Sequence, residues 1–177
     1  MSRSKRKAAA IGPERLAAFP IFEGMSSAQL ARLWEIVEVR EYPAGEVIVQ
    51  EGESGDALYL LLAGEVEVSK SLTLMVARGN VDTRDKALDR LSAAQSPFFG
   101  EMALLDDSHH RTATVRTLTE STLGLLRRKP CMTLCHEDPS LGFLLMRNIA
   151  STLATRLDKA NKDILKLTTA FSLALRE

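Results

Sequence analysis

Apolar residues near the start of the chain recur at the spacing of a helix. Leu30 and Leu33 fall on one face of such a helix. Ser26 or Ser27 supplies the hydroxyl that can cap it. An earlier apolar run, from about Pro13, has the same pattern. We therefore expect two helical segments ahead of the rest of the chain.

After residue 38 the pattern changes to short runs rich in β-branched residues, and glycine turns separate the first four of them. Short strands at roughly ten-residue spacing with such turns indicate an antiparallel sandwich or barrel. A polar stretch over 77–86 predicts an exposed hairpin loop. We expect strands over 39–42, 46–50, 57–62, 65–68, 72–76, 87–91, 112–116 and 121–126.

A helical pattern returns after Arg128 and continues to the end of the chain. Pro130 suits the first turn of a short helix, and Pro139 opens a long one from about Ser140. Apolar residues of the long helix alternate in steps of four and three, which is typical of a coiled coil. We expect this seam to join two copies of the chain as a homodimer; the alternative is packing on the barrel of the same chain. The seam consists of Met146, Ala150, Leu153, Leu157, Ala160, Ile164, Leu167, Phe171 and Ala174.

The length of 177 residues fits one domain with flanking helices. We expect a disordered basic tail over 1–12, a barrel with its N-terminal helices over 13–139, and a long helix over 140–177. The 23 basic and 23 acidic residues balance, so the net charge of the chain is zero and does not attract nucleic acid. No signal peptide, membrane-spanning stretch or disulfide framework is evident, and the simplest interpretation is a cytoplasmic protein.

Residues 98–116 hold the most specific chemistry, and it suits an anion. Gly100 lets backbone approach a ligand without a Cβ in the way. The free N–H groups around Ala103, at the start of a short helix, favour negative charge. Arg111 offers a planar fork of donors that fits a phosphodiester, and Thr112 can add a hydroxyl. Glu101 would repel a phosphate, so an acceptor role toward a sugar hydroxyl explains it better.

This segment resembles the phosphate-binding cassette of the cyclic-nucleotide-binding domain family. The glycine-punctuated runs 42–48, 51–59 and 62–66 resemble the strands of that family's jelly-roll barrel. The stretch 92–97 departs from the family because it lacks the customary glycine. The resemblance implies a mainly β fold, a double-stranded β-helix with flanking helices, and a regulatory ligand that is cAMP or cGMP. No metal and no catalysis are implied.

The same resemblance assigns roles to individual residues. Glu101 would accept from the ribose 2′-OH, while Arg111 and Thr112 would hold the cyclic phosphate. The long helix would cover the purine, which brings Asn161 near the base. The expected ligand-binding set is Gly100, Glu101, Met102, Ala103, Arg111, Thr112, Ala113 and Asn161.

Several alternatives remain beside the cyclic-nucleotide sensor. The barrel could be a ligand-free scaffold that recruits a protein partner through the seam. The chain ends about where the long helix ends, so we expect no helix-turn-helix, unless it is a truncated transcription regulator. Cys131, Cys135 and His136 have possible zinc spacing, although buried cysteines on a helix are the simpler explanation. A cupin-type metalloenzyme would need several inward histidines on strands, and the chain has three histidines in all.

Overall fold

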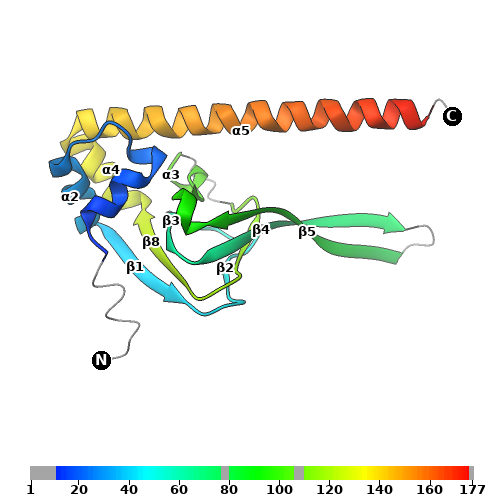
Figure 1. The fold of residues 1–177 in the computed structure, drawn as a ribbon, viewed down its shortest axis with the longest axis horizontal. Coiled ribbons are helices and arrows are strands. Elements are labelled where there is room, and N and C mark those ends of the chain that lie inside the picture. Colours follow the sequence, from blue (N-terminus) through cyan, green and yellow to red (C-terminus); the bar gives the residue numbers. More distant parts are fainter. Residues whose placement is uncertain (1–10, 77–79, 106–109, 176–177) are drawn as a thin grey trace.

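Two antiparallel four-stranded sheets form a barrel in this computed structural model, which describes residues 11–76, 80–105 and 110–175. One sheet has the strand order β1-β8-β3-β6 and the other β2-β7-β4-β5. The predicted architecture, a β-barrel between N-terminal helices and a long C-terminal helix, is confirmed (Figure 1). The strands are β1 (Val37–Tyr42), β2 (Val47–Val49), β3 (Ala57–Ala63), β4 (Glu65–Val76), β5 (Asn80–Ser92), β6 (Phe98–Phe99), β7 (Thr114–Thr117) and β8 (Ser121–Arg127).

The N-terminal helices and α4 gather at one end of the barrel, where α5 begins before running along it (Figure 1). Ser26, rather than Ser27, caps the first α-helix, because its Oγ accepts from the Gln29 N–H at 3.3 Å. Gln29 Oε1 in turn accepts from the Ser26 N–H at 3.0 Å, which completes a capping box. The helical elements are η1 (Pro13–Ala18), η2 (Pro20–Phe22), α2 (Ser27–Glu35), η3 (Ala93–Gln95), α3 (Met102–Leu105), α4 (Arg128–Glu137) and α5 (Pro139–Ala174).

Apolar side chains form two buried clusters. One joins the N-terminal helices and the start of α5 to the barrel, and includes Phe19, Leu58 and Leu145. The other fills the barrel between its sheets, and includes Leu61 and Leu123. The barrel and the helical end therefore fold around connected apolar surfaces, which fixes where α5 starts.

The predicted loop over 77–86 is wrong for residues 80–86, which lie in β5. β4 is likewise one strand over Glu65–Val76 where two were expected. The two strands pair continuously from Glu65↔Ser92 to Val76↔Asn80 and project from the barrel as a ribbon (Figure 1). A two-stranded ribbon beyond the barrel has no face buried in the core. Apolar and polar residues therefore need not alternate along it, and this alternation is the pattern from which a strand is predicted. Residues 77–79 lie outside the described part.

The second half of α5 leaves the barrel and extends in the same direction as the β4–β5 ribbon in Figure 1. Leu153 is the last half-buried residue, and every residue from Ala154 to Leu175 is exposed. Leu157, Ile164 and Phe171 are 60–66% exposed. Within the described residues, the barrel therefore covers the predicted seam only as far as Leu153.

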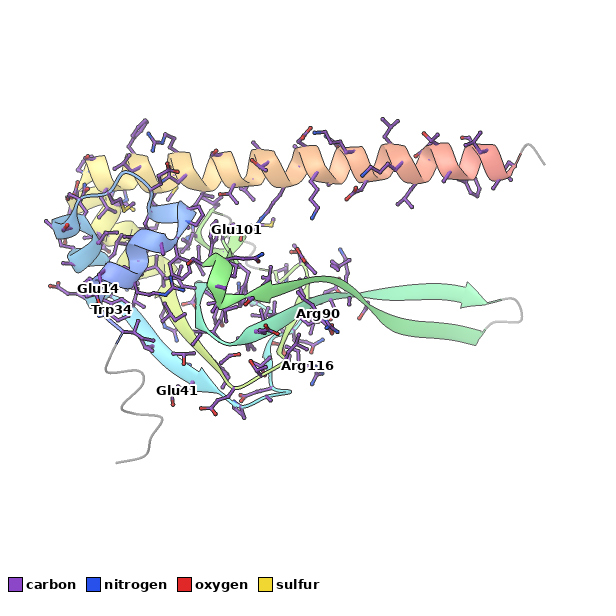
Figure 2. All side chains as sticks on the ribbon, viewed as in Figure 1. Glu14, Trp34, Glu41, Arg90, Glu101 and Arg116 are labelled. Carbon is purple, nitrogen blue, oxygen red and sulfur yellow. The ribbon has the colours of Figure 1, made fainter. Side chains whose placement is uncertain are left out.

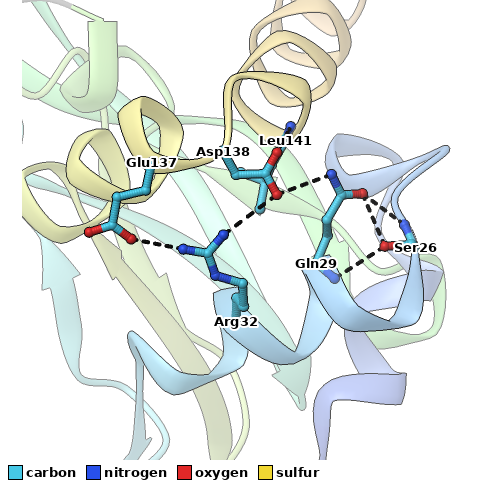
Figure 3. Close-up of polar contacts among 6 residues, drawn as sticks. All are labelled: Ser26, Gln29, Arg32, Glu137, Asp138 and Leu141. Carbon is cyan, nitrogen blue, oxygen red and sulfur yellow. Dashed lines mark hydrogen bonds and ion pairs between the residues drawn. The ribbon is translucent and has the colours of Figure 1, made fainter.

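A polar network fastens α2 to the joint between α4 and α5 (Figure 3). Asp138 caps α5 by accepting from the Leu141 N–H at 3.0 Å, and Gln29 Nε2 donates to its other oxygen at 3.4 Å. Arg32 pairs with Glu137 at 2.8 Å and with Asp138 at 3.6 Å. The hydrogen bond from the Leu141 backbone, followed by the Gln29 bond, lowers the pKa of Asp138.

The variant Asp138→Asn should melt at a lower temperature than the wild type at neutral pH, because it keeps the capping oxygen but loses the charge. A carboxyl whose folded pKa is lowered stabilises the fold above its unfolded pKa, about 3.9, and this contribution fades as the pH falls through the folded pKa. The gap in melting temperature, followed by circular dichroism from pH 7 to pH 2, should therefore close in acid. Glu137→Gln, which removes only an exposed ion pair, is the control. A gap that is constant with pH would contradict this role.

Candidate functional site

A cavity of about 270 Å³ lies against the β2-β7-β4-β5 sheet, between the segment from β6 to α3 and the helix α5. Its wall is apolar and its rim is polar. The wall consists of Val49, Val68, Leu91, Phe98, Phe99 and Val115. The rim consists of Asp89, Gly100, Glu101, Arg111, Thr112, Ala113 and Arg156.

Arg111 is held in place by the loop between β2 and β3. Its N–H donates to the Glu53 carbonyl at 2.8 Å, and its own carbonyl accepts from the Gly52 N–H at 2.8 Å. The guanidinium donates to the Ala57 carbonyl at 3.0 Å and lies 5.5 Å from the centre of the Tyr59 ring. The glycine-rich stretch before β3 is therefore the support of this arginine.

The Arg111 side chain is buried between two glycines. A Cβ added at Gly55 would lie 2.3 Å from its Nε, and one at Gly100 would lie 2.6 Å from its Nη1. Gly100 also has φ +76°, which favours glycine. Arg111 is 9% exposed, yet none of the described carboxylates forms an ion pair with it. A buried charge without an ionic partner at the edge of a cavity suits an anionic ligand.

Glu101 is 5% exposed and pairs with an arginine of α5. Arg156 Nη1 lies 2.5 Å from Glu101 Oε1, and its Nη2 donates to the Phe98 carbonyl at 3.0 Å. The Arg156 guanidinium also lies 5.2 Å from the centre of the Phe98 ring. Figure 2 shows Glu101 on the side of the barrel that faces α5. The rim of the cavity is thus tied directly to the long helix.

The remaining predicted ligand residues divide between two places. Met102 and Ala103 line a smaller cavity of about 60 Å³ that also includes Gly100, Arg111 and Thr112. The Ala103 N–H donates to the Gly100 carbonyl at 3.1 Å, so it is already engaged in the turn of α3. Asn161 is exposed on α5 and lines neither cavity, and its contact with a base stays a prediction. Residues 106–109 of the cassette loop lie outside the described residues.

Sequence reasoning missed Arg156 and Asp89. A signal for Arg156 exists, because it follows the buried Ile149 by seven residues and therefore continues the core-facing side of α5 with a charge. A charged residue in line with core residues indicates a polar partner below the helix. Asp89 has no comparable signal, since its position depends on the pairing of β4 and β5.

The sequence profile of the cyclic nucleotide-binding domain matches residues 39–138, more than half of the chain. The chain belongs to this family. Its two sheets with a long C-terminal helix are the family's jelly-roll barrel, as predicted. The cavity rim from Gly100 to Ala113 lies inside the matched range.

The proteins that the chain resembles include regulators. The chain is 27% identical over 154 residues to a CRP-like cAMP-activated global transcriptional regulator of Mycobacterium tuberculosis, covering 87% of this chain and 62% of that protein. It is 34% identical over 109 residues to a cAMP-dependent protein kinase regulatory subunit of Emericella nidulans, and the match covers 62% of this chain and 23% of that protein. The crystal structure of the Thermus thermophilus catabolite activator protein superposes with a TM-score of 0.68 at 28% identity. The superposition covers 84% of this chain and 63% of that chain. The chain thus spans about three fifths of the length of the first relative.

The two cysteines are free and lie on α4. Cys131 is buried and Cys135 is half-buried, and a hydrogen bond from the Cys131 thiol to Cys135, together with burial, raises the pKa of Cys131. The described residues contain no group of three or more side chains that could hold a metal ion. No helix among them is both long enough and apolar enough to span a membrane.

Proposed function

We propose that this chain is a sensor domain that binds a cyclic mononucleotide, cAMP or cGMP, in the 270 Å³ cavity without converting it. The observation that carries the proposal is the buried Arg111 guanidinium, which has no ionic partner among the described residues and lines the cavity. A cyclic phosphate would supply that partner, with Thr112 beside it. The cAMP-activated and cAMP-dependent proteins among the relatives support this class of ligand.

Glu101 supplies the second half of the proposed recognition. Its buried carboxylate lies on the same rim as Arg111 and can accept from the ribose 2′-OH. Arg156 already donates to one of its oxygens, Oε1. A ribose hydroxyl would therefore share the carboxylate with α5 or displace the helix contact.

This shared carboxylate gives the ligand a route to an output. A ligand shifts a conformational equilibrium only by its differential affinity for the two states. The Arg156 contacts with Glu101 and the Phe98 carbonyl exist only while α5 lies on the cavity rim. Ligand binding would change the free energy of those contacts, and the helix or a protein partner bound to it would carry the signal. We further propose that the protein performs this role in the cytoplasm.

A thermal-shift experiment tests the proposed function. The protein is heated with cAMP, cGMP, and the non-cyclic AMP and GMP as controls. A ligand at about a hundred times its Kd stabilises the folded state by about 2.7 kcal/mol, which raises the melting temperature by roughly 5–10 °C for a chain of this size. Stabilisation by cAMP or cGMP, without stabilisation by AMP or GMP, supports the sensor function. No shift with any of them supports the ligand-free scaffold.

The exposed seam of α5 supports a homodimer as part of this proposal. Ile164→Asp should convert a dimer into a monomer at micromolar concentration, because a charge in the centre of a coiled-coil seam is desolvated. Leu165→Asp is the matched control, since Leu165 is as exposed but faces about 100° away on the helix. Sedimentation velocity measures both. A monomeric wild type, or equal disruption by both variants, would contradict the seam.

A further inference from the structure

One row of paired residues crosses the sheet beneath the cavity. Val49 on β2 pairs with Val115 on β7, and Val115 pairs with Val68 on β4. Val68 pairs in turn with Asp89 on β5. All four residues line the 270 Å³ cavity. Three neighbouring valines therefore form an apolar floor of the cavity, and a carboxylate lies at the end of their row.

Asp89 is the first regularly paired residue of β5 after a β-bulge. Ser69 pairs with Ala87 although Val68 pairs with Asp89, so Leu88 is an extra residue in β5. Asp89 shares its face with Leu91, two residues further on, because side chains alternate along a strand, and Leu91 also lines the cavity.

The neighbouring arginine does not neutralise this carboxylate. Arg90 follows Asp89 in β5, so its side chain lies on the other face of the β4–β5 pair, where it forms an ion pair with Glu67 at 3.5 Å. Within the described residues, the one polar contact of the Asp89 carboxylate is the Arg90 backbone N–H, which donates to Oδ1 at 2.9 Å. The second oxygen and the remaining lone pair of the first are available to donors in the cavity.

The anion site and Asp89 lie at different strands along this floor. Arg111 and Thr112 precede β7, whose Val115 belongs to the row. Asp89 lies two strands away from Val115, which is about 10 Å across the sheet. A nucleotide whose phosphate is held by Arg111 would direct its base along the valines toward Asp89.

We propose that Asp89 recognises the base of the bound nucleotide and selects guanine over adenine. This inference rests on the proposed function. An ionised carboxylate only accepts hydrogen bonds, and guanine presents two adjacent donors, N1–H and the 2-amino group, that match its two oxygens. Adenine presents one amino group beside N1, whose lone pair the carboxylate repels. The valine floor supplies an apolar surface for either purine, so the discrimination comes from the carboxylate.

The test compares the affinities of cGMP and cAMP in the wild type and in Asp89→Asn by isothermal titration calorimetry. The wild type should bind cGMP more tightly than cAMP. The variant keeps the shape of the side chain, removes its charge and introduces a donor, so it should weaken cGMP by roughly 10- to 100-fold. Its affinity for cAMP should stay the same or rise. Glu67→Gln, a carboxylate of the same ribbon on the opposite face, is the control and should leave both affinities unchanged.

The outcomes separate the two proposals. Preference of the wild type for cAMP, or an unchanged ratio of affinities in Asp89→Asn, overturns the base assignment and leaves the sensor function standing. Equal weakening of both nucleotides also overturns it, because a general effect on the cavity is not base recognition. Absence of binding by either cyclic nucleotide to the wild type overturns both. Asp89 is exposed and its replacement should leave the melting temperature of the free protein unchanged.

Discussion

Arg111→Ala should weaken cyclic nucleotide binding by roughly 30- to 5,000-fold, corresponding to about 2–5 kcal/mol. The reason is the setting of the side chain, which is 9% exposed and packed between Gly55 and Gly100. A phosphate bound there loses a desolvated partner that water cannot replace. Arg111→Lys should recover only part of the affinity, because an ammonium group lacks the planar fork of donors. Isothermal titration calorimetry measures all three proteins.

The free protein should tolerate the loss of Arg111, which keeps this experiment interpretable. Its guanidinium contributes one hydrogen bond, to the Ala57 carbonyl, and its backbone bonds to the β2–β3 loop persist in the variant. The free energy of unfolding should therefore change by no more than about 1–2 kcal/mol. Arg116→Ala is the control, because Arg116 is an exposed arginine on β7 that bonds the Gly45 carbonyl outside the cavity (Figure 2). Unchanged affinity in Arg111→Ala would refute the site.

The part of the site that sequence could predict is local. Gly100, Glu101 and Arg111 lie within twelve residues, and each has its own chemical reason to be there, so their spacing alone carries the prediction. The structure brings all three to the rim of one cavity. The short strands and their glycine turns were predictable for the same reason, because turn chemistry and period act over a few residues.

The part that sequence could not predict depends on contacts between distant segments. Arg156 reaches Glu101 across 55 positions, and its role depends on the register of α5 over the barrel. Asp89 faces the cavity because β5 pairs with β4 in the register that sets it opposite Val68. Hydrophobic periodicity reports which face of an element is buried, whereas it does not report which residue of another element lies opposite.

Ser96 shows how one departure from the family pattern is accommodated. It stands in the stretch where the customary glycine is absent, and it adopts a left-handed conformation with φ +48°. The side chain is buried, and its Oγ accepts from Arg15 Nη1 at 2.8 Å. Arg15 also donates to the Ala93 carbonyl at 2.9 Å. Contacts from η1 therefore hold a backbone conformation that glycine would adopt without help.

Gly64→Ala should destabilise the fold far more than Gly45→Ala, although both glycines have similar turn roles and nearly equal φ values, +89° and +84°. Alanine at such a φ costs about 1–2 kcal/mol by itself, so this cost is common to both variants. A Cβ at Gly45 meets nothing within 4 Å. A Cβ at Gly64 would lie 2.6 Å from the Glu120 carbonyl oxygen and 2.7 Å from the Ser121 Cα, which are backbone atoms that no rotamer change can move.

The difference between these two variants therefore isolates the close approach of the β3–β4 turn to the β7–β8 turn. Relief of the clash would have to separate the turns and break the bond from the Ser121 hydroxyl to the Glu65 carbonyl, 3.3 Å long. We expect Gly45→Ala to lose about 1–2 kcal/mol of unfolding free energy in urea titration, and Gly64→Ala to lose at least about 3 kcal/mol more, enough to leave a marginal domain largely unfolded at 37 °C. Equal losses in the two variants would mean that the turns are not in contact in solution. Since the β7–β8 turn joins the strand that carries Val115 to the strand that supports β3, its displacement would also loosen the cavity floor, so Gly64→Ala should lose ligand binding while Gly45→Ala retains it.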